Sequence, residues 1–113
     1  MIELLLRLWY WLLDWLWPAT TYRARRVEER PDVPAAGVLY LIGHGEHVWE
    51  AAMRCPNRCG RTLSMNLLAA EKPCWKLEEH SDGTATLSPS IWRRTDCGCH
   101  FFLKRGRVEW VRT

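Results

Sequence analysis

The chain has 113 residues and a formal net charge of +3, from 16 basic and 13 acidic side chains. This length predicts a single domain with a modest core, and so small a charge gives no argument for nucleic-acid binding. We expect no secretory signal, so the five cysteines, an odd number, favour metal binding over a disulfide framework.

Residues 1–17 are expected to form a hydrophobic, amphipathic helix. No helix breaker precedes Pro18, and Glu3, Arg7 and Asp14 fall on one narrow stripe of a helix. The rest of the surface is almost entirely leucine, isoleucine and tryptophan. A helix of this length spans about 25 Å, less than the bilayer core of about 30 Å. The segment is therefore expected to lie on a membrane or to dock on a protein.

A basic segment, with Arg23, Arg25 and Arg26, follows the predicted helix. Positive charge beside a membrane-attached helix favours the cytoplasmic side. We therefore expect a cytoplasmic protein, attached to the inner face of the cytoplasmic membrane if the helix contacts lipid.

Residues 22–113 are expected to form a second unit of short strands. Two hairpin signals, Ser81-Asp82-Gly83 and Lys104-Arg105-Gly106-Arg107, separate runs of strand length. The pattern predicts a mainly β fold, either an all-antiparallel sheet or a small sandwich. Strands are expected at residues 22–28, 37–42, 49–54, 62–67, 75–79, 84–87, 100–104 and 108–111.

Two clusters of cysteine and histidine indicate a zinc site that staples this β domain. Thiolate sulfur and imidazole nitrogen are ligands that zinc prefers, and a structural zinc takes four of them in a tetrahedron. Cys74 stands apart and is expected to be a free thiol. The expected ligands are Cys55, Cys59, Cys97 and His100, with Cys99 as the alternative to His100.

The tripeptide Ser88-Pro89-Ser90 offers a candidate nucleophile. A serine attacks only if a base takes its proton and donors hold the oxyanion. No G-x-S-x-G motif is present, and a turn is the simpler interpretation of the tripeptide. If Cys99 is the fourth zinc ligand, His100 becomes available as a base. The candidate bases are His44, His47, His80 and His100.

Four segments resemble a small bacterial family, the BubE-type proteins, which are encoded beside ubiquitin-like conjugation genes. These segments are GVLYLIG, CPNRCGRTLSMNLL, DGTATLSPSIWR and CGCHFFLKRGRVEW, and the resemblance covers about residues 22–110. The family usually has C-P-C-G-C-G and C-R-S-H-F, so Asn57 replaces a cysteine here and Cys99 replaces a serine.

The resemblance implies a peptidase that matures or removes a ubiquitin-like protein. Ser90 and His100 match the family's recurrent serine and histidine, and the implied partners are the ubiquitin-like protein and its activating and conjugating enzymes. The alternative is a non-enzymatic zinc module that recruits a protein partner to the membrane. A peptidase requires Ser90 to be exposed in a groove with a histidine at hydrogen-bond distance, whereas a binding module does not.

Overall fold

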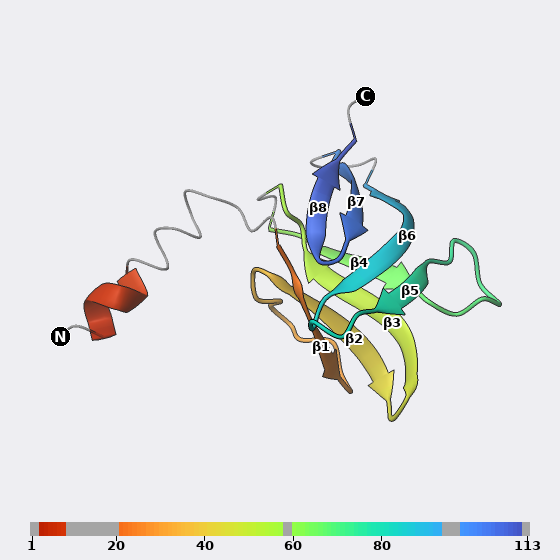
Figure 1. The fold of residues 1–113 in the computed structure, drawn as a ribbon, viewed down its shortest axis with the longest axis horizontal. Coiled ribbons are helices and arrows are strands. Elements are labelled where there is room, and N and C mark those ends of the chain that lie inside the picture. The colour runs from red at the N-terminus through yellow and green to blue at the C-terminus, as the bar shows by residue number, and fades with distance from the viewer. Residues whose placement is uncertain (1–2, 9–20, 58–59, 94–97, 112–113) are drawn as a thin grey trace.

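A computed structural model describes residues 3–8, 21–57, 60–93 and 98–111. Within these residues the β domain consists of two four-stranded sheets, with strand orders β1-β2-β3-β4 and β5-β6-β7-β8 (Figure 1). The strands are β1 (Arg23–Val27), β2 (Val38–His44), β3 (His47–Arg54), β4 (Thr62–Asn66), β5 (Lys76–Glu79), β6 (Ala85–Trp92), β7 (His100–Lys104) and β8 (Arg107–Trp110). The expected mainly β fold is confirmed.

One hydrophobic core lies between the two sheets, because alternate side chains of each strand point to the same face. Leu39 and Leu41 of β2 share this core with Phe101 and Leu103 of β7, and all four are almost fully buried. The other members of the core are Tyr22, Ala51, Met53, Cys55, Leu63, Met65, Ala85, Leu87, Ile91 and Cys99.

The expectation of an all-antiparallel fold is wrong for one pair of strands. β1 and β2 run parallel, with Arg23 opposite Val38. A parallel pair requires a crossover in place of a hairpin, and residues 28–37 supply it. Part of this crossover is tied to the outer face of the first sheet, where the Ala35 N–H donates to Tyr40 Oη at 3.0 Å.

The Ser88-Pro89-Ser90 segment lies within β6, so the expectation of a turn there is wrong. Leu87 pairs with Leu103, and Ile91 pairs with Phe101. The three residues between Leu87 and Ile91 on β6 therefore lie opposite one residue, Phe102, on β7. Proline has no N–H to contribute to a ladder and is found in sheets at such irregularities. The result is a bulge that ends at Ile91, directly after Ser90.

Residues 3–8 of the predicted N-terminal helix are helical. Leu4, Leu5, Leu6 and Leu8 are between 47% and 65% exposed. Residues 9–17 lie outside the described residues, so the full length of the predicted helix and its amphipathic pattern stay predictions. Among the residues that are described, no helix has both the length and the apolar character needed to cross a membrane.

Candidate active site and metal-ligand cluster

Ser90 and His100 meet on adjacent strands of the second sheet. The Ser90 Oγ lies 2.9 Å from the His100 Nε2, and both residues are half-buried. His100 is paired with Trp92, and Ser90 lies two residues before Trp92, so Ser90 is a diagonal neighbour of His100 on the same face of the sheet. A hydroxyl and an imidazole nitrogen at this distance have the geometry of a nucleophile and a general base.

Two of the other candidate bases are engaged elsewhere. The Nε2 atom of His80 is 2.7 Å from Thr86 Oγ1. The Nδ1 atom of His44 is 3.3 Å from the Glu28 carboxylate, at an exposed position. Among the candidate histidines, the hydrogen bond to Ser90 comes from His100.

Two tryptophans hold the Ser90–His100 pair. The Trp92 ring stacks on the His100 ring, with centroids 4.7 Å apart and planes at 10°. The Trp75 Nε1–H donates to the Ser90 carbonyl oxygen at 3.3 Å. A base whose ring is packed in place and a nucleophile whose main chain is anchored are prepared for reaction with little reorganisation.

The other ring nitrogen of His100 lies on the buried side of the imidazole. Nδ1 is buried and forms no hydrogen bond with any described residue. If Nε2 accepts a proton from Ser90, the neutral ring must carry its own proton on Nδ1. If Nδ1 were a metal ligand instead, Nε2 would keep a proton and could only donate. The two sequence-predicted roles of His100 therefore exclude each other.

Cys99 points to the opposite side of the chain from His100. Its Sγ lies 3.6 Å from the Cys55 Sγ, and both side chains are buried in the core. Successive side chains of an extended chain alternate in direction, which explains why neighbouring residues enter different sites. Two thiolates about 2.3 Å from a tetrahedral zinc are about 3.8 Å apart. The observed separation therefore fits two ligands of one zinc.

The remaining predicted ligands, Cys59 and Cys97, lie outside the described residues. Within residues 3–8, 21–57, 60–93 and 98–111, no group of three or more His, Cys, Asp or Glu side chains is arranged to hold a metal. Cys74 is half-buried, and its thiol lies 3.5 Å from the Trp75 carbonyl oxygen.

Tyr22 closes the core beside the two cysteines. Its Oη donates to the Arg54 carbonyl oxygen at 2.8 Å. Burial raises the pKa of Tyr22 above its usual value, and the negative charge of a Cys55 thiolate raises it further. The Tyr22 hydroxyl therefore remains a neutral donor that fixes the main chain directly before Cys55.

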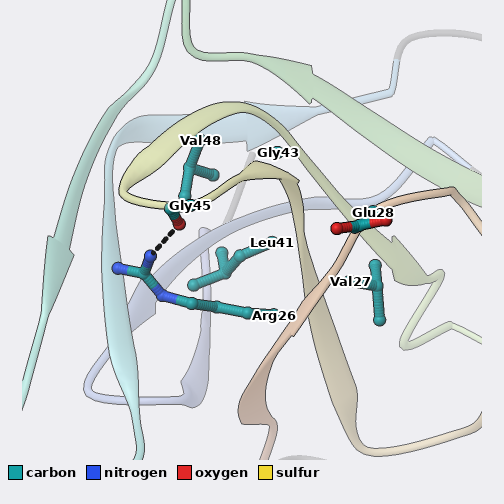
Figure 2. A pocket seen from close by; sticks show the side chains of 7 residues that line it. All are labelled: Arg26, Val27, Glu28, Leu41, Gly43, Gly45 and Val48. Atoms are coloured by element: carbon teal, nitrogen blue, oxygen red, sulfur yellow. Dashed lines mark hydrogen bonds between the residues drawn. The ribbon is translucent and has the colours of Figure 1, made fainter.

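Two surface cavities accompany these residues. One, of about 160 Å³, is lined by segments of β4 and β6 and by Trp75, and so adjoins Ser90. The other, of about 200 Å³, lies among β1, β2 and β3, where the Arg26 Nη1–H donates to the Gly45 carbonyl oxygen (Figure 2). None of the sequence-predicted site residues lines either cavity.

Trp75 and Trp92 are the site residues that sequence reasoning did not identify. Side chains two positions apart on a strand point to the same face, so the sequence alone would have placed Trp92 on the same face as Ser90. The contact of Trp75 depends on where β5 begins relative to β6, and no local pattern in the sequence reports that position.

A family model described as "Bacterial ubiquitination-like system serine protease (BubE)" matches residues 26–111. No curated protein matches the chain, and no solved structure does. The family match includes all the strands from β2 to β8 and both residues of the Ser90–His100 pair. It agrees with the resemblance seen in the sequence segments and extends over most of the chain, which therefore belongs to the BubE family.

Proposed function

We propose that this chain is a serine peptidase that cleaves the bond at the C-terminus of a ubiquitin-like protein. Ser90 is the nucleophile and His100 is the general base. The observation that carries the proposal is the 2.9 Å separation of Ser90 Oγ and His100 Nε2. Membership of a family of serine proteases from bacterial ubiquitination-like systems supports the same chemistry. The partners are the ubiquitin-like protein and its conjugating machinery.

In the proposed reaction, His100 accepts and donates the proton in both the acylation step and the hydrolysis step. His100 Nε2 takes the Ser90 Oγ proton while the oxygen attacks the scissile carbonyl carbon. His100 then gives that proton to the leaving amine, and an ester joins Ser90 to the ubiquitin-like protein. Water, deprotonated by the same nitrogen, hydrolyses the ester and regenerates the serine.

We propose a structural zinc held by Cys55, Cys59, Cys97 and Cys99, with Cys99 in place of His100. The 3.6 Å separation of the Cys55 and Cys99 sulfurs supports this set. The direction of the His100 Nε2 toward Ser90 supports it as well, since a metal-bound imidazole could not act as the base. Such a zinc supplies folding energy and anchors the chain where it enters β7.

Replacing His100 with alanine should separate the two roles of the histidine. We expect cleavage of a ubiquitin-like precursor to fall by about 10²–10⁴-fold, the usual contribution of a general base. Zinc content and the unfolding temperature should stay close to those of the unaltered protein. His80→Ala is the matched control and should remain active. If His100→Ala loses its zinc together with its fold, His100 is a ligand and the base is another residue.

We further propose that residues 1–17 attach the peptidase to the cytoplasmic face of the membrane. The exposed leucines of residues 3–8 support this proposal, because a solvent-facing apolar surface usually marks an interaction site.

Deleting residues 1–17 should leave a folded, active β domain. The deletion is expected to move the protein from the membrane fraction of a cell lysate to the soluble fraction, because the exposed leucines are removed with the segment. Fractionation with immunodetection measures the move, and circular dichroism measures the fold. Loss of the β fold would mean that the segment belongs to the core, and an unchanged distribution would mean that it is not the anchor.

A further inference from the structure

The cavity beside Ser90 is a groove between strands of different sheets. On one side it is lined by consecutive residues of β4, and on the other by consecutive residues at the end of β6 and just beyond it. Its volume is about 160 Å³, and Trp75 lies against it. We refer to it as the β4–β6 groove; its lining residues are Leu63, Ser64, Met65, Trp75, Ile91, Trp92 and Arg93.

Within the described residues, no further strand pairs with either bordering strand along the groove. β4 is the edge strand of the first sheet. β5 begins at Lys76, which pairs with Ser88, so the pairing of β5 with β6 ends before Ser90 is reached. Sheet edges of this kind are sites where an extended peptide can add as a further strand.

The main chain of Ser64 points into the groove. The Leu67 N–H donates to the Trp49 carbonyl on β3 at 3.0 Å, so Leu67 and every second residue before it direct their main-chain N–H and C=O toward β3. By alternation, the N–H and C=O of Ser64 and Asn66 point away from β3. The Trp75 N–H donates to the Asn66 carbonyl at 2.8 Å, in agreement with this phase. No described residue hydrogen-bonds the Ser64 main chain, so its donor and acceptor face the groove.

Two residues that line the groove also contact the candidate catalytic pair, whereas Ser90 and His100 are not themselves among the lining residues. Trp75 lines the groove and donates to the Ser90 carbonyl, and Trp92 lines it and stacks on His100. The buried ends of the lining side chains are apolar, since Leu63, Met65 and Ile91 belong to the core. A chain lying in the groove would meet main-chain hydrogen bonds at its edge and an apolar floor.

We propose that the β4–β6 groove binds the segment of the substrate next to the scissile bond as an added β-strand, paired with the Ser64 main chain. The substrate is therefore a polypeptide that is extended at the cleaved junction, with an apolar side chain directed at the groove floor. This inference rests on the proposed peptidase function, because it assigns the groove by its position beside Ser90.

The test compares Ser64→Pro with Ser64→Ala. Proline removes the edge N–H and places its ring there, and it is tolerated at an edge position whose N–H is outside the ladder. We expect kcat/KM for a ubiquitin-like precursor to fall about tenfold in Ser64→Pro, mainly through KM, which corresponds to the loss of one main-chain hydrogen bond. Ser64→Ala keeps the main-chain N–H and removes only the hydroxyl, which accepts from Arg30 at 3.3 Å, so the difference in kcat/KM between the two variants measures the main-chain contribution.

A small fluorophosphonate probe separates substrate binding from the reactivity of Ser90. It needs no strand pairing, so it should label Ser90 in Ser64→Pro at the unaltered rate. If the unaltered protein is not labelled at Ser90, the proposed function is wrong. If it is labelled and Ser64→Pro cleaves the precursor normally, the groove inference is wrong and the function stands. Increased cleavage by Ser64→Pro would also overturn the inference, since it would mean that the groove normally holds another segment of this chain or a second copy.

Substrate analogues give a measurement that alters no residue of the protein. Synthetic peptides that cover the cleaved junction are prepared with single N-methylated main-chain amides. Pairing with Ser64 requires that methylation at alternate positions raises KM while methylation between them has little effect. Equal cleavage of all the methylated peptides would overturn the strand-addition proposal, even if Ser64→Pro itself failed to fold.

Discussion

Ser90→Ala is expected to reduce cleavage of a ubiquitin-like precursor by about a thousandfold or more, because removal of a serine nucleophile eliminates the covalent route. The Ser90 side chain is half-buried and its described hydrogen bond is to His100. Its removal should therefore leave the unfolding temperature and zinc content almost unchanged. The measurement is precursor cleavage followed by gel electrophoresis or mass spectrometry, with thermal unfolding recorded on the same samples.

Ser88→Ala is the matched control for this experiment. Ser88 is exposed, is two residues away on the same strand, and is adjacent to the same proline. We expect it to cleave at the unaltered rate. Full activity of Ser90→Ala would exclude the serine mechanism, and a purely recruiting role would then become the leading interpretation unless the metal itself is catalytic.

Cys55→Ser is expected to lose zinc and most of the native structure. Structural zinc contributes about 10–16 kcal/mol of apparent binding energy, which is as large as the whole stability of a small domain, about 5–15 kcal/mol. A serine hydroxyl does not replace a thiolate ligand. Cys99→Ser should behave in the same way, because its sulfur lies 3.6 Å from that of Cys55.

Cys74→Ser controls for the loss of a thiol without the loss of a ligand, and it should keep both zinc and fold. Elemental analysis gives the zinc stoichiometry, expected to be one per chain, and circular dichroism gives the structure before and after a chelator. A folded sample that contains no metal would contradict the zinc proposal. If Cys55→Ser alone loses zinc and Cys99→Ser keeps it, the fourth ligand is a residue other than Cys99.

The hairpins could be predicted from the sequence because their turn chemistry is local. Ser81-Asp82-Gly83 separates β5 from β6 and Arg105-Gly106 separates β7 from β8, as expected. The parallel pairing of β1 with β2 could not be predicted in this way. It depends on residues 28–37 crossing the sheet, and that path is set by packing against Tyr40 and its neighbours.

The sequence also indicated Ser90 and His100 as a pair, but it left both His100 and Cys99 open as the fourth ligand of the predicted zinc. That choice depends on which of two adjacent side chains faces the core. The direction of each side chain is set by the pairing of Trp92 with His100 and of Ile91 with Phe101, and these are contacts between strands. Ala85, Leu87 and Ile91 all face the core despite the bulge at Pro89, so alternation counted from Ala85 correctly places Ser90 on the outer face of β6.

The two parts of the proposed site differ in how far apart their components are along the chain. Ser90 and His100 are ten residues apart on neighbouring strands of one sheet, and closing so short a loop costs little conformational entropy. The β4–β6 groove, in contrast, joins segments from two different sheets and exists only when both sheets are assembled. Reactivity toward a small electrophile and recognition of a protein substrate thus rest on separate levels of the architecture. A change that loosens the association of the sheets would impair recognition before it disrupts the chemistry.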